Sequence, residues 1–153
     1  MKIFLGVLVL ILSTLIGYKL SEKYVLRKKF YTDFASFNEK LTREVSFLQT
    51  TILSLIKENE MVSDFSETLM VYIKEEKFIF SKKYLNEEEI EYFKKYLGVI
   101  GSVDRALQIT FLNTVSYDLK GKLTVVADDE KKYKTLYLKL GFLTGLIALI
   151  LLL

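Results

Sequence analysis

The chain has 153 residues, which is room for one domain at most. Its formal net charge is only +3, without the basic excess of a dedicated nucleic-acid-binding protein, so we expect no nucleic-acid partner. The sequence contains no cysteine and no histidine. This excludes disulfides and thiolate metal sites, and it removes the commonest general base and transition-metal ligand. The absence of proline favours long uninterrupted helices and an all-α fold.

The first predicted element is the apolar run Ile3–Leu20. Its only polar side chains are those of Ser13, Thr14, Tyr18 and Lys19. As a helix it would be roughly 27 Å long, close to the thickness of the hydrocarbon core of a bilayer. A cleaved signal peptide is the alternative, but no Ala-x-Ala-like site follows the run. We therefore expect residues 1–20 to form a transmembrane helix.

The next feature is a stripe of apolar residues at steps of three and four, which marks one face of a long amphipathic helix. The stripe consists of Phe30, Phe34, Phe37, Leu41, Val45, Leu48, Ile52 and Leu55. We expect this helix to run from about Glu22 to Glu58 and to be able to continue out of the first span. The stripe packs either against helices of the same domain or, in a coiled-coil contact, against a partner.

Shorter helices are expected next. Ser63 or Asp64 can cap a helix, residues 77–84 are expected to contain a helix end and a loop, and Asn86 can cap the next helix. The carboxylates of Glu87–Glu91 could bind a divalent cation. The helix dipole explains them more simply, so we expect no metal site.

A junction and a last long helix complete the middle of the chain. Gly101 is the natural stop of the preceding helix, and Ser102 or Asp104 can cap the one that follows. Apolar residues then keep helical spacing as far as Leu140. The sequence therefore predicts a helix of some 45 residues that enters the second apolar run.

That second run, Leu140–Leu153, would be only about 21 Å long as a helix, which fits a buried core helix. Adding residues 137–139 extends it to about 25 Å, with Lys139 reaching back to the interface. We prefer a membrane span over 137–153, because three terminal leucines have nothing polar to offer to water.

Basic residues flank both runs on the side of the middle segment, residues 21–136. They are Lys19, Lys23, Arg27, Lys28, Lys29, Lys120, Lys122, Lys131, Lys132, Lys134 and Lys139. The positive-inside rule then predicts that residues 21–136 form a cytoplasmic α-helical domain anchored in the cell membrane.

Small residues in both apolar runs are spaced for close helix packing. Gly141 and Gly145 form a Gly-x-x-x-Gly motif, and Ser13 and Gly17 form a small-x-x-x-small motif. Two antiparallel spans could approach each other at these residues. We expect this to be their packing face.

No sequence motif of catalysis is present. The chain has no Walker-type loop, no dinucleotide glycine fingerprint, no nucleophile elbow and no zinc-ligand spacing. We therefore expect a protein without a cofactor and without enzymatic activity.

Three segments carry a family resemblance. Residues Gly17–Tyr24, the pattern formed by Gly101, Asp104 and Gln108, and the terminal stretch Leu140–Leu146 together resemble stage III sporulation protein AB. The resemblance implies a component of the channel-like complex that endospore formers build between mother cell and forespore. Members of that family are similar to the inner-membrane platform subunit of type II secretion machines.

The resemblance further implies partners: the other membrane subunits of the complex and a cytoplasmic secretion-type ATPase, with the chain in the mother-cell membrane during sporulation. We expect the partner contact around Gly101, Asp104 and Gln108, where a helix end exposes polar groups. The alternative is an unrelated two-span adaptor that holds a cytosolic signalling or division protein at the membrane.

Overall fold

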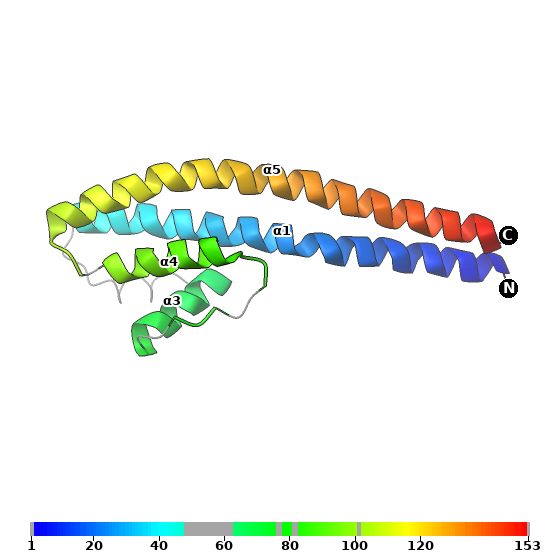
Figure 1. The fold of residues 1–153 in the computed structure, drawn as a ribbon, viewed down its shortest axis with the longest axis horizontal. Helices are drawn as coiled ribbons and strands as arrows, with labels where there is room; N and C mark the ends of the chain where they lie inside the picture. The colour runs from blue at the N-terminus through cyan, green and yellow to red at the C-terminus, as the bar shows by residue number, and fades with distance from the viewer. Residues whose placement is uncertain (1, 48–62, 76–77, 81–82, 101, 153) are drawn as a thin grey trace. The chain divides into compact units, whose positions relative to one another are not determined.

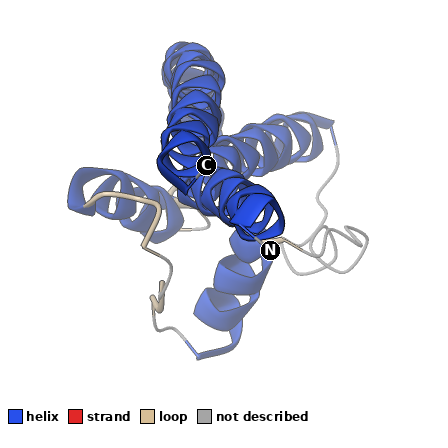
Figure 2. Ribbon diagram, turned by 90° about the vertical axis from the view of Figure 1, so that its right-hand side faces the viewer, coloured by secondary structure: helices blue, strands red, loops and turns tan. Residues whose placement is uncertain are grey.

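The protein is all-helical in the residues that the structure describes, which are 2–47, 63–75, 78–80, 83–100 and 102–152 of a computed structural model. These residues contain helices α1 (Lys2–Phe47), α3 (Asp64–Glu75), α4 (Glu87–Val99) and α5 (Arg105–Leu152), shown in Figure 1. No strand occurs among them (Figure 2). The all-α prediction is confirmed.

Two very long helices dominate the fold. Helix α1 has 46 residues and α5 has 48, so each is roughly 70 Å long. Helix α1 contains both the first apolar run and the start of the Phe stripe, and α5 continues into the second apolar run. The predicted 45-residue helix is thus confirmed. Residues 48–58 of the other predicted helix lie outside the described part of the chain.

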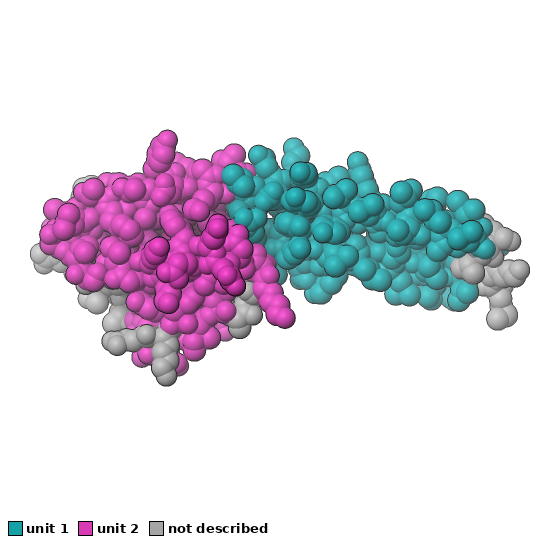
Figure 3. Space-filling model, viewed as in Figure 1, with its two compact units in different colours: residues 1–28, 125–153 teal, residues 29–124 magenta. Residues whose placement is uncertain are grey.

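The chain forms two compact units, coloured separately in Figure 3. The span unit consists of residues 1–28 and 125–153, and the core unit consists of residues 29–124. These limits differ from the predicted membrane limits at residues 20 and 137. The units describe packing within the protein, so where the bilayer begins stays a prediction.

Aromatic rings fill the interior of the core unit. Phe34 of α1 is 1% exposed and packs on Phe65 of α3 and on Phe93 and Tyr96 of α4, with ring centroids 5.6, 5.2 and 4.7 Å away. The stripe residues Phe30, Phe37 and Leu41 are buried as well. The described part of the stripe therefore packs within its own domain, as the first of the two interpretations proposed.

Side-chain caps fix where the short helices begin. At the start of α3 the backbone amide of Ser63 donates to the hydroxyl of Ser66, and the amide of Ser66 donates to the hydroxyl of Ser63. Asn86 Oδ1 accepts from the amide of Glu89 at 2.8 Å, and the Glu89 carboxylate accepts from the amide of Asn86 at 2.9 Å. This reciprocal capping box confirms the predicted cap of α4. Residues 78–80 between the two helices have no regular structure.

Both long helices include a segment that could cross a membrane by length and composition. Only 11% of the apolar window of each is buried within the protein, whereas a core helix of a soluble protein would be mostly buried. Large apolar side chains such as Phe4, Ile16 and Leu151 are 76%, 61% and 82% exposed. Such surfaces fit flanking transmembrane helices.

Candidate functional site: the seam between the apolar helices

The span unit is held together by a seam, which we define as Ser13 and Gly17 of α1 with Gly141, Thr144 and Gly145 of α5. A Cβ atom added to Gly141 would lie 2.7 Å from the carbonyl oxygen of Ser13 and 3.2 Å from the Cα of Gly17. One added to Gly145 would lie 2.8 Å from the Cα of Leu10. The atoms in the way belong to the backbone, so the two helices touch backbone to backbone. This arrangement requires glycine at both positions.

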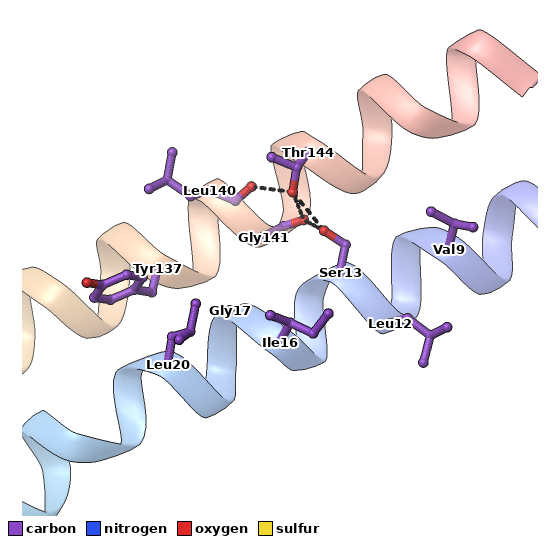
Figure 4. Close-up of a pocket in the computed structure, with 10 residues that line it drawn as sticks. All are labelled: Val9, Leu12, Ser13, Ile16, Gly17, Leu20, Tyr137, Leu140, Gly141 and Thr144. Atoms are coloured by element: carbon purple, nitrogen blue, oxygen red, sulfur yellow. Dashed lines mark hydrogen bonds between the residues drawn. The ribbon is translucent and has the colours of Figure 1, made fainter. Parts of the chain in front are cut away.

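Hydroxyl groups bridge the seam (Figure 4). The Ser13 hydroxyl donates to the carbonyl oxygen of Gly141 at 2.6 Å, and it lies 2.7 Å from the hydroxyl of Thr144. The Thr144 hydroxyl also reaches the carbonyl oxygens of Leu140 at 2.9 Å and of Gly141 at 3.0 Å. Each hydroxyl therefore has a partner inside the protein, which a polar group in hydrocarbon requires.

An open groove of about 510 Å³ runs along the seam. Its lining, labelled in Figure 4, consists of Val9, Leu12, Ser13, Ile16, Gly17, Leu20, Tyr137, Leu140, Gly141 and Thr144. None of these residues carries a carboxylate or an amine. The lining is therefore mostly apolar, with the hydroxyls of Ser13, Tyr137 and Thr144 as its polar side-chain groups.

Tyrosines join the two helices next to the seam. The ring of Tyr24 on α1 stacks on Tyr133 of α5 with centroids 4.5 Å apart, and it lies 6.1 Å from the ring of Tyr137. The amine of Lys23 lies 5.0 Å from the centre of the Tyr24 ring. Tyrosine and lysine are typical of the layer where a span meets lipid headgroups.

Two ion pairs follow the tyrosines. Arg27 pairs with Asp129 and Lys28 with Glu130, each at 2.8 Å. The hydrogen bond from Lys28 holds the pKa of the Glu130 carboxyl below its usual value. Sequence reasoning missed these pairs and Thr144. A signal was available in the sequence: the basic dipeptide Arg27-Lys28 and the acidic dipeptide Asp129-Glu130 lie at similar distances from the two apolar runs.

The structure describes two of the three residues predicted at the helix junction; Gly101 lies outside the described residues. Asp104 is exposed, and its carboxylate accepts from the amide of Leu107 at 3.0 Å, so Asp104 caps α5. Ser102 instead donates to carbonyls at the end of α4. We expected exposed polar groups here, but Gln108 is only 7% exposed. It packs inward because it shares a helix face with buried Leu112.

A buried amide joins α1 and α5 within the core unit. The Asn38 side chain has no exposed surface, and its amide donates to the carbonyl of Leu112 at 3.0 Å and to the hydroxyl of Ser116 at 2.7 Å. A buried polar side chain of this kind favours one register of paired helices over the others. Sequence reasoning missed it, although Asn38 directly follows the stripe residue Phe37.

Two tyrosines of the core unit have phenol groups whose pKa is raised by their surroundings. Tyr84 donates to Asp64 at 2.8 Å, and burial together with this carboxylate raises the pKa of Tyr84. Burial, and to a lesser extent Asp118, raises the pKa of Tyr92 to about 12. Both phenols are thus neutral at physiological pH. Tyr84 is a hydrogen-bond donor, whereas the buried Tyr92 hydroxyl has no hydrogen-bond partner among the described residues and serves in packing.

No cluster of metal-ligating side chains occurs in the part of the chain that the structure describes. Of the carboxylates at the start of α4, Glu89 is used by the capping box. Glu87 and Glu88 lie in the first turn, where the helix dipole favours negative charge.

Comparison with known proteins gives one result. Residues 58–153 match the family described as stage III sporulation protein AB. No curated protein and no solved structure matches the chain. The matched region contains α3, α4, α5 and the α5 half of the seam.

Proposed function

Because the chain belongs to the stage III sporulation protein AB family, we propose that it is a non-enzymatic membrane scaffold of a secretion-like sporulation channel. Membership places its role in stage III of spore formation. We further propose that it recruits a cytoplasmic secretion-type ATPase and the other membrane subunits of the complex.

The observation that carries this proposal is the seam. Two apolar helices from opposite ends of the sequence meet backbone to backbone at Gly17 and Gly141, with their hydroxyls satisfied inside the protein. Such a pair is suited to anchoring a helical domain in a bilayer, and no carboxylate or amine lines its groove. Anchoring and presentation of a folded domain are the properties that a scaffold needs.

The proposed orientation places the core unit in the cytoplasm of the mother cell, with both termini across the membrane. The basic residues near the two spans support this, because the positive-inside rule depends on Lys and Arg and little on acids. The pairing of Arg27 and Lys28 with acidic residues does not weaken that argument.

The proposed partner contact lies at the junction before α5, with Asp104 as its exposed acid. Since Gln108 is buried, it would support the contact by packing and would not touch the partner. Asp104 also caps α5. The two roles of Asp104 can be separated, because serine retains the cap and removes the charge.

The test is a pull-down from sporulating cells that carry the tagged full chain with Asp104→Ser, with Glu91→Ser on an exposed face of α4 as the matched control. The wild type and the control should recover the ATPase and the membrane subunits, and Asp104→Ser should recover less. Equal recovery from all three, with normal spore formation, would remove the junction as the contact. Failure of the wild type to recover the ATPase would contradict recruitment itself.

The alternative, an unrelated two-span adaptor for a signalling or division protein, rests on the same two anchors. The match to the sporulation family favours the channel scaffold. Recovery of a division or signalling protein in place of channel subunits would reverse this preference.

A further inference from the structure

Helix α5 has an outward face in the core unit with a regular heptad spacing. Leu107, Thr114 and Gly121 lie seven residues apart, and Thr110, Tyr117 and Thr124 follow each of them by three residues. We call these six residues the outer stripe. All six are exposed, Tyr117 at 81% and Leu107 at 60%, and none is charged. These are the a and d positions of a two-helix coiled coil.

The outer stripe differs from the other solvent faces of the same unit. The exposed residues of α4 include Glu87, Glu88, Glu91, Lys94 and Lys95. This is the usual composition of a helix face that meets water. The six uncharged residues run along about five turns of α5, with the exposed charges of Asp118 and Lys120 beside them and not among them. This uncharged line indicates a surface that is covered in the working protein.

The threonines of the outer stripe do not need water. The hydroxyls of Thr110, Thr114 and Thr124 donate to carbonyl oxygens one turn earlier in α5, at 3.0, 3.0 and 3.1 Å. With the hydroxyls bonded to their own helix, the methyl groups are available for contact. Threonine is also a weak helix former, so local stability does not explain its repeated use here.

Gly121 is another residue of the outer stripe whose identity the contacts within the chain do not explain. A Cβ on Gly121 would meet nothing within 4 Å, so no contact inside the chain requires glycine. Glycine in a helix interior costs about 1 kcal/mol relative to alanine. One turn earlier stands Tyr117, whose side chain is 81% exposed. In a coiled coil, a large side chain of one helix inserts into a space on the facing helix. Tyr117 could supply such a side chain, and Gly121 could leave such a space.

We propose that the outer stripe is the contact between two copies of this chain, with their α5 helices parallel and in register. The parallel direction rests on the proposed function, because two copies anchored in one membrane in the same orientation have α5 helices that run the same way. In a symmetric parallel pair each residue of the outer stripe faces the same residue of the other copy, so a charged residue there would face a like charge. The uncharged stripe meets this condition. A contact with a different protein would not need an uncharged stripe, because that protein could carry charges opposite to those on α5.

The flanks of the stripe fit the same arrangement. Asn113 and Asp118 occupy g and e positions, which meet across a parallel pair, and an amide can donate to a carboxylate. From Leu107 to Thr124 the contact would be roughly 26 Å long. This is short for a coiled coil in free solution. Confinement of both copies to one membrane raises their effective concentration and makes a short contact sufficient.

Cysteine crosslinking tests the proposal directly, since the chain has no cysteine of its own. Purified full chain is reconstituted in lipid vesicles with one substitution at a time: Thr110→Cys, Tyr117→Cys or Thr124→Cys. Lys95→Cys on the exposed face of α4 is the matched control. Mild oxidation should give covalent homodimers roughly tenfold faster at the three stripe positions than at the control. Crosslinking at only one stripe position would contradict a parallel pair, and rates equal to the control would overturn the proposal.

A charge variant provides a second readout. Tyr117→Glu places two like charges opposite each other and should abolish the Thr110→Cys crosslink, whereas Lys95→Glu should leave it unchanged. Retained crosslinking in a helical Tyr117→Glu variant would contradict the contact. Because only the purified chain is used, a Thr110→Cys chain with Tyr117 in place that fails to crosslink, while ATPase recovery is intact, would count against the pairing alone. Loss of ATPase recovery with intact crosslinking would count against the proposed function alone.

Discussion

Replacement of Gly141 by isoleucine is the sharpest perturbation of the seam. The new Cβ would lie 2.7 Å from the Ser13 oxygen, whereas ordinary contacts of a Cβ begin at 3.4 Å. Backbone atoms cannot rotate aside, so the helices must separate by about 0.7 Å for the Cβ alone. The further carbons of a branched side chain demand more. The Ser13–Gly141 hydrogen bond, 2.6 Å long, is then lost.

The expected cost combines two terms. Overpacking of a close contact costs about 1–3 kcal/mol, and an interhelical hydrogen bond in a membrane protein is worth about 0.6 kcal/mol. The pairing of the two helices should therefore weaken by about 2–4 kcal/mol. Since each 1.4 kcal/mol is a factor of ten, this corresponds to roughly 30- to 1,000-fold in the pairing equilibrium.

A disulfide placed away from the substitution can report this equilibrium. A Cβ on Gly6 would lie 3.5 Å from the Cα of Leu149, so Gly6→Cys with Leu149→Cys brings two thiols together across the helix pair. The Leu149→Cys change also removes the leucine methyl that a Cβ on Gly6 would meet. Equilibration with glutathione in lipid vesicles then gives the effective concentration of the two thiols.

The matched control is Leu143→Ile, a change of similar volume at a residue that is 53% exposed. Gly141→Ile should lower the effective concentration by the stated factor, and Leu143→Ile should leave it nearly unchanged. If the two variants differ by less than about threefold, well under 1 kcal/mol, the argument from backbone contact is wrong.

Three further predictions follow from single residues. Gly98→Ala should raise the free energy of unfolding by about 1 kcal/mol, because nothing lies within 4 Å of the new Cβ and alanine is the better helix former; denaturant unfolding in detergent with no gain would contradict this. Asn38→Leu should lower the unfolding free energy by about 1–3 kcal/mol by removing two buried hydrogen bonds, and an unchanged melting temperature would show that these bonds contribute nothing. The folded pKa of Glu130 is depressed, so its contribution is present above the unfolded pKa of about 4.3 and is lost as the pH falls through the folded value; the stability difference between wild type and Glu130→Gln should therefore disappear in acid, and a difference that grew below about pH 4 would refute the assignment.

The helices could be predicted from the sequence because their signals are local. Absence of proline, apolar steps of three and four, and the caps at Asn86 and Asp104 all act within a few residues. The small-residue spacing also selected Ser13, Gly17, Gly141 and Gly145, and the structure brings these four residues together.

What escaped prediction depends on the register between distant segments. The pairing of Lys28 with Glu130 and of Ser13 with Thr144 is set by how α1 and α5 align, which no local pattern determines. Burial of Gln108 was a different case. Its helical spacing from Leu112 was a usable signal, but polar character was taken to mean exposure.

The central claim is that paired spans hold the core unit in the cytoplasm, and labelling of Lys95→Cys tests it most directly. Lys95 is exposed on α4, and the chain has no other thiol. A membrane-impermeant thiol reagent should fail to label this variant in intact cells and should label it fully after lysis. Labelling in intact cells as efficient as in lysed cells would place the core unit outside the cytoplasm, where it could not recruit a cytoplasmic ATPase.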